Sequence, residues 1–313
     1  MLRLGSVPQA ASRSAAKAGA SDIVRIMFGG CAVAGNLLCV ACSDARGRVI
    51  LVDLEERRPV SRFDYTGPGG GYAEAAGIAM DGEHSIFVAD PANHVVRRFT
   101  LFGKELGHLG LPVQAVPGGV LRDRVGVLHR PSGVAILDDV VHVACGEVGW
   151  RHGVQRFHRD GRVMRALLAH GDPERSFGAP RGIAAGPEGV FVADTLHGEV
   201  QRFTTHGRYV SSFRVAVGDA EAARPVAVQP LSDGRILVAD SGDRPGLRLF
   251  GLDGRPLGWP GPEPACDRPQ ALCRDARGSL YVLDRDGERV QRLHRDLHCP
   301  TVVFDLAEFL HDF

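Results

Sequence analysis

The sequence has little of several features that mark common functional classes. Its 37 Lys and Arg residues balance 37 Asp and Glu residues, so no net charge draws the chain to nucleic acid or to an anionic membrane. It contains neither a P-loop nor a G-x-S-x-G motif, the usual signatures of nucleotide binding and of serine hydrolases. Apolar residues make up 44% and charged residues 24%, which is the balance of a globular protein.

Cysteine is present without a disulfide pattern. The chain has seven Cys, an odd number without regular spacing, which predicts reduced thiols in a cytosol-like compartment. Cys39 and Cys42 form a C-x-x-C motif inside an apolar run that is typical of a strand. Residues three apart on a strand point to opposite faces, so these two sulfurs do not bind one metal ion together. We expect structural thiols.

The N-terminal region raises two questions of targeting. Residues 1–21 carry Arg3, Arg13 and Lys17 but no acid, which predicts a disordered basic segment in a cytoplasmic protein. The alternative is a mitochondrial transit peptide. Residues 26–43 are uncharged and nearly long enough to span a membrane. Several Gly interrupt this run and its second half fits the repeat below, so we expect no membrane span.

A short β-rich phrase, typically Val-Ala-Asp, recurs six times along the chain. The spacing between successive phrases averages about 48 residues, which is the size of a four-stranded propeller blade. The phrases end at Cys42, Asp90, Cys145, Asp194, Asp240 and Asp284.

Each phrase lies in a constant frame. In the fourth unit, the small residues 182–185 precede the phrase, and 200–203 and 209–213 follow it as further strands, with a Gly turn between them. Where six sheets converge, only small side chains fit the innermost strand. The second strand is packed between neighbouring blades and is therefore apolar on both faces. The frame predicts an all-β fold, a six-bladed β-propeller of four-stranded antiparallel blades.

These residues resemble the NHL repeat, whose consensus is Pro-x-Gly-Ile-Ala, Val-Ala-Asp, Arg-Ile-Gln-x-Phe and Asp-Gly. The match extends over about residues 30–306, is strong in blades 2, 4 and 5, and is weakest in blade 1, where Cys42 replaces the Asp. The resemblance implies a six-bladed propeller. It implies no single function, because such propellers include lyases, lactonases, RNA binders and protein scaffolds.

The frame also divides the chain. We expect a disordered segment over 1–21, the propeller over 22–306 and a short amphipathic helix in the tail, 307–313. A partner-binding peptide is the alternative for the tail. Residues 300–304 supply the fourth strand of blade 6, so residues 22–28 become an extra strand that we expect to close the ring between blades 6 and 1.

The connections before each first strand and after each second strand share one face of a propeller, here named the loop face. Two interpretations apply to the charged residues expected there. The arginines and the phrase-ending aspartates form ion pairs and capped turns, or the arginines line a mouth for a carboxylate, phosphate or acidic peptide. Trp150 either contacts a partner or packs over the adjacent blade. The candidate binding residues are Arg130, Trp150, Arg151, His152, Arg181, Arg224 and Arg268.

Catalytic ligands are missing from the positions where related propellers carry them. The NHL-like lyase that trims amidated peptide precursors binds zinc through His set just after Pro in innermost strands. The matching residues here include Ser132, Arg181, Val226 and Gln270, and none is His. Lactonase-like propellers hold a central cation with Glu, Asn and Asp, whereas this chain has only two Asn. We expect no catalytic residue, no metal and no cofactor.

The sequence therefore favours a non-catalytic scaffold that presents the loop face to a protein or peptide partner. A hydrolase or lyase with an unrecognised ligand set remains open. Single-stranded RNA binding through the arginine-rich face is the third hypothesis. The zero net charge and the low aromatic content of 6% argue against it.

Overall fold

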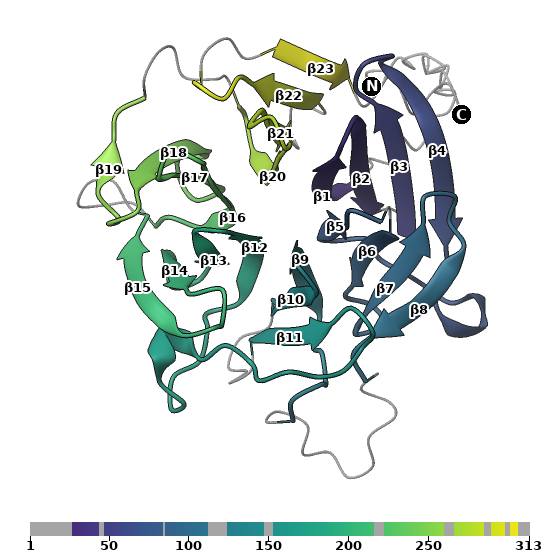
Figure 1. Ribbon diagram of the computed structural model, residues 1–313, viewed down its shortest axis with the longest axis horizontal. Coiled ribbons are helices and arrows are strands. Elements are labelled where there is room, and N and C mark those ends of the chain that lie inside the picture. The colour runs from purple at the N-terminus through teal and green to yellow at the C-terminus, as the bar shows by residue number, and fades with distance from the viewer. Residues whose placement is uncertain are drawn as a thin grey trace, which may run out of the picture.

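Six antiparallel sheets surround a common axis, and each is built from one consecutive stretch of chain (Figure 1). The computed structural model describes residues 27–43, 47–83, 85–111, 124–146, 153–215, 222–259, 266–284, 289–297 and 301–305. The chain folds as a six-bladed β-propeller.

In the first half of the ring the innermost strands are β1, β5 and β9, and the chain then moves outward strand by strand. Blade 1 comprises β1 (Met27–Ala34), β2 (Leu37–Ser43), β3 (Gly47–Asp53) and β4 (Arg58–Tyr65). Blade 2 comprises β5 (Ile78–Met80), β6 (Ser85–Asp90), β7 (Val95–Thr100) and β8 (Glu105–Leu109). Blade 3 comprises β9 (Pro131–Leu137), β10 (Val140–Cys145) and β11 (Val154–His158), and two isolated bridges from β11, to Val163 and Leu167, mark its outer edge.

The second half repeats this order. Blade 4 comprises β12 (Pro180–Gly186), β13 (Gly189–Asp194), β14 (Glu199–Phe203) and β15 (Tyr209–Arg214). Blade 5 comprises β16 (Pro225–Pro230), β17 (Arg235–Asp240), β18 (Gly246–Gly251) and β19 (Pro256–Leu257). Blade 6 comprises β20 (Pro269–Arg274), β21 (Leu280–Asp284), β22 (Arg289–Leu293) and β23 (Thr301–Asp305).

The small residues of the innermost strands are required by close packing around the axis. A Cβ on Gly133 would lie 2.3 Å from the Arg181 carbonyl oxygen, and a Cβ on Gly77 would lie 2.5 Å from that of Ser132. Gly77 also donates its N–H to the Ser132 carbonyl at 2.9 Å, which joins blade 2 to blade 3. The second strands β6 and β13 are buried along their whole length, as the apolar phrase predicts.

Ring closure differs from the sequence expectation. Residues 27 and 28 begin β1 and pair with β2 of blade 1, so the predicted extra strand over 22–28 is wrong for these two residues, and 22–26 lie outside the described part. Blade 6 has four strands of its own. Among the described residues, the side chains of β1 and β2 pack against blade 6, with Val40, Leu283 and Phe304 buried between them.

The remaining expectations concern strands and helices. Residues 301–305 form the predicted outer strand of blade 6, and Cys39 and Cys42 face opposite sides of β2 in two separate core clusters, as expected. Helical structure within the described ranges is limited to single 3₁₀ turns such as Pro68–Gly70 and Ala169–Gly171. None of the described helices is long and apolar enough to cross a membrane. The helix expected over 307–313 and the segment 1–21 fall outside these ranges.

Candidate functional site: the loop face at the channel mouth

Four arginines predicted for the loop face occupy equivalent places around the axis. Arg130, Arg224 and Arg268 directly precede β9, β16 and β20, and Arg181 is the second residue of β12. All four side chains are exposed. They are brought to the same face because every innermost strand starts there.

Buried aspartates at the ends of the second strands hold the loops that carry two of these arginines. Asp240 accepts the backbone N–H of Arg224 at 2.7 Å, and Asp284 accepts that of Arg268 at 2.9 Å. Both carboxylates are almost fully buried, at 1% and 0% exposure. The main chain of each loop is thereby fixed, while the arginine side chain extends to solvent.

The charges of these aspartates are balanced by other arginines. Arg97 lies 3.0 Å from Asp90, and Arg248 lies 2.8 Å from Asp240. Arg289 lies 3.1 Å from Asp284. The capped turns expected from the sequence are therefore confirmed, but the ion pairs form with third-strand arginines of the same blade rather than with Arg130, Arg181 or Arg224.

Three of the loop-face arginines have exposed guanidinium groups that no described carboxylate pairs with. Within the part of the chain that the structure describes, no carboxylate lies within 4.0 Å of the guanidinium groups of Arg130, Arg181 and Arg224. Exposed guanidinium groups without a counter-charge present forked donors to carboxylates or phosphates.

Arg130 is held by a neighbouring blade. His94, on the loop between β6 and β7, accepts the Arg130 backbone N–H through Nδ1 at 3.1 Å. Arg130 has a left-handed φ of 47°, which is uncommon for a residue with a side chain, and its carbonyl accepts the N–H of Gly146 at 3.1 Å. Bonds on both sides of the residue fix this conformation.

The axial channel is narrow at this face. Arg181, Ser132, Val226 and Gln270 line a cavity of about 70 Å³, room for only a few water molecules. Ser132 donates its hydroxyl to the Pro180 carbonyl at 2.9 Å and so links blades 3 and 4. Imidazole and carboxylate groups are absent from the described lining of this cavity, which agrees with the innermost residues in the sequence.

The other candidate residues lie in the connection that follows the second strand of blade 3. Trp150, Arg151 and His152 lie outside the described residues, so their predicted contact role stays a prediction.

Blade 4 carries a titratable cluster in place of the usual aspartate–arginine pair. Possible ligand atoms of Asp194, His197 and Glu199 all lie within 4.8 Å of one another, and His170 Nε2 lies 2.8 Å from a Glu199 carboxylate oxygen. The Gln201 amide donates to Asp194 and to Glu199, at 3.0 Å each. Burial raises the pKa of both carboxyl groups.

This cluster offers two kinds of chemistry. The His197 imidazole and the Asp194 and Glu199 carboxylates are donors that Zn²⁺ accepts, and the same groups are joined by hydrogen bonds, with Gln201 donating to both carboxylates. The sequence candidates named above do not include His197, Glu199 or His170. The Asp-x-x-His-x-Glu spacing at 194–199 was the available signal for Glu199, whereas His170 comes from a distant connection.

Comparison with known proteins establishes the fold and leaves the family open. No protein-family profile matches the chain. The structure is similar to virginiamycin B lyase from Staphylococcus aureus, with a TM-score of 0.60 and 14% identity over 88% of this chain and 83% of that one. It is also similar to a chain of a nidogen/laminin complex, with a TM-score of 0.57 and 14% identity over 88% of this chain and 91% of that one. U3-55K gives a TM-score of 0.58 at 12% identity, over 89% and 81%. At these identities the likeness shows the propeller fold alone.

Proposed function

We propose that this protein is a binding scaffold whose loop face takes a protein or peptide partner with acidic side chains at the contact. The observation that carries the proposal is the group of exposed loop-face arginines without a described counter-ion, Arg130, Arg181 and Arg224, of which Arg130 and Arg224 have their backbone N–H groups held by side-chain acceptors. A rigid loop loses little conformational freedom when it binds, so such a surface is suited to recognition.

The channel supports binding over catalysis. A hydrolase or lyase of this architecture needs an acid, a base or a metal where substrate enters, and the described channel mouth supplies Ser132, Gln270 and Arg181 instead. Lyases are among the similar structures, and so is a chain of a protein complex, so the fold is compatible with both classes. The NHL resemblance belongs to the same proposal and rests on the repeat phrases.

Binding of a fluorescein-labelled oligoglutamate peptide, followed by anisotropy at low and high salt, tests the proposal. We expect Arg181→Glu and Arg224→Glu each to weaken binding about tenfold, because like charges then face each other across the contact. Arg277→Glu is the matched control, since Arg277 is exposed in the turn between β20 and β21 on the opposite face. Its affinity should equal that of the wild type.

The same assay separates protein from RNA recognition. Oligouridylate replaces oligoglutamate as the probe, with the same variants. Tight, salt-dependent binding of the RNA together with failure of oligoglutamate to bind would overturn the proposal in favour of single-stranded RNA. Equal effects of Arg181→Glu and Arg277→Glu would remove the loop face from consideration.

A further inference from the structure

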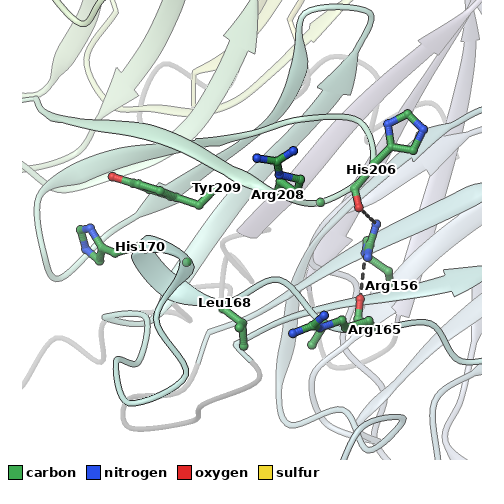
Figure 2. A pocket seen from close by; sticks show the side chains of 10 residues that line it. Arg156, Arg165, Leu168, His170, His206, Arg208 and Tyr209 are labelled. Carbon is green, nitrogen blue, oxygen red and sulfur yellow. Dashed lines mark hydrogen bonds between the residues drawn. The ribbon is translucent and has the colours of Figure 1, made fainter.

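A groove on the outer wall of the ring, between blades 3 and 4, is separate from the loop-face arginines. It encloses about 460 Å³ and is lined by side chains from β11, from the outer edge of blade 3 and from the turn between β14 and β15. Figure 2 shows Arg156 and His206 at one end and His170 with Tyr209 at the other. The cationic or titratable lining residues are Arg156, Arg165, His170, His206 and Arg208.

Arg156 is a buried charge without a counter-charge among the described residues. Its side chain is 6% exposed, with Nε donating to the Arg165 carbonyl at 2.8 Å and Nη1 to the His206 carbonyl at 2.9 Å (Figure 2). The described residues place no carboxylate within ion-pair distance of it. Burial and the nearby Arg165 guanidinium lower the pKa of Arg156. Buried charges are ordinarily paired, so the floor of the groove holds an excess positive charge.

The equivalent arginines of other blades have a partner that blade 3 lacks. Arg98 lies over the Phe87 ring at 5.4 Å, and Arg202 lies over the Phe191 ring at 5.7 Å. The register puts His142 opposite Arg156, at the place of those phenylalanines. A histidine ring at this position makes a weaker cation–π interaction with the guanidinium group than a phenyl ring does.

The turn above Arg156 is shaped around the guanidinium group. A Cβ on Gly207 would lie 2.7 Å from Arg156 Cζ, and Gly207 has a positive φ of 88°, so glycine is the residue that fits on both counts. The next residue, Arg208, and Arg165 across the groove are both exposed, and neither has a described carboxylate within ion-pair distance. Arg156, Arg165 and Arg208 therefore line the same groove.

We infer that this groove binds a phosphate monoester, with the phosphate held by Arg156, Arg165 and Arg208. Forked N–H donors match phosphate oxygens, and a dianion supplies the counter-charge that the buried Arg156 lacks. Leu168 and the Tyr209 ring form the less polar part of the lining, where the esterified group packs. The volume is in the range of small-molecule sites.

Isothermal titration of the full chain with phenyl phosphate tests the inference. The double variant Arg165→Gln, Arg208→Gln changes exposed residues and leaves the buried Arg156 in place, so the fold is retained. We expect its affinity to fall more than tenfold, because two charge-assisted contacts are lost. Arg255→Gln is the matched control, since Arg255 follows the Gly of the same hairpin turn in blade 5. It should bind as the wild type does.

A phosphoserine peptide in a second titration identifies the source of the phosphate. Tighter binding of the peptide than of phenyl phosphate assigns the groove to a phosphorylated side chain, and the reverse order assigns it to a free monoester. Absence of measurable binding by either probe would overturn the inference, as would wild-type affinity in the double variant. Loop-face variants such as Arg181→Glu should not alter this titration. Failure of the phosphate-binding inference can therefore be distinguished from failure of the proposed function.

Discussion

At the scale of the residue, His142 shows how one substitution in a repeat changes local electrostatics. Its ring is fully buried in β10, and neither nitrogen has a hydrogen-bond partner among the described residues. Burial, with a smaller contribution from Arg156, lowers the pKa of His142 to about 3. Blades 2 and 4 carry Phe87 and Phe191 at this position. The folded state therefore holds a neutral imidazole where blades 2 and 4 hold a phenyl ring.

Stability should fall in acid because of this histidine. Between its ordinary pKa of 6.5 and about 3, the unfolded chain binds a proton that the folded chain does not, so the free energy of unfolding decreases as the pH falls below 6.5. In urea unfolding, the free energy of unfolding of the wild type should decrease between pH 7 and pH 5. In His142→Phe this decrease should be smaller by about 2 kcal/mol. His108→Phe, at an exposed position, is the control. An unchanged pH dependence in His142→Phe would contradict this account.

At the scale of the element, the aspartate that ends a second strand organises the adjoining loops. Asp240 accepts the N–H of Arg224 and, at 3.0 Å, that of Gly242, and it pairs with Arg248. One buried carboxylate thus connects the loop before β16, the loop after β17 and the strand β18. The loop-face arginine next to it is positioned as a consequence.

Asp240→Ala should lower the free energy of unfolding by about 3 to 5 kcal/mol, because Arg248 and two backbone N–H groups lose a buried acceptor. Asp243→Ala, on the same loop and exposed, should change it by less than about 0.5 kcal/mol. Chemical unfolding of both variants measures the difference. Equal small effects would show that Asp240 does not brace the loops.

The strands and loops also differ in how far the sequence predicts them. Strand order, the bounds of the second strands and the arginines before innermost strands were predictable, because the repeated phrase sets a local register. The groove around Arg156 was not, since Arg156, Arg165 and Arg208 come from a strand, an outer edge and a turn of two blades without a shared motif. The cluster around Asp194 was missed in part for the same reason.

At the scale of the whole molecule, the described residues of the first and last blades meet through side-chain packing. The expected extra strand was a reasonable prediction from a weak first repeat, yet blade 1 builds a complete four-stranded sheet from its own residues. Apolar contacts join β1 and β2 to blade 6, and Val40 and Leu283 belong to this buried cluster. We therefore expect the closing contact to contribute to stability as much as a contact between two other blades.

Two leucine substitutions compare the closing contact with an internal one. Leu283 is buried between blades 6 and 1, and Leu237 is buried between blades 5 and 6. Leu283→Ala and Leu237→Ala should each cost about 2 to 5 kcal/mol and retain a single unfolding transition by tryptophan fluorescence and circular dichroism. Two separate transitions in Leu283→Ala alone would show that the closing contact is the weak point of the ring.

The loop face as the recognition surface is the central claim, and hydrogen exchange with bound oligoglutamate tests it most directly. We predict slower exchange in the connections 195–198, 222–224 and 241–245, which carry or adjoin the arginine loops, and unchanged exchange in the opposite turns 231–234 and 275–279. Protection confined to the opposite turns, or to the outer wall around 206–209, would contradict the claim.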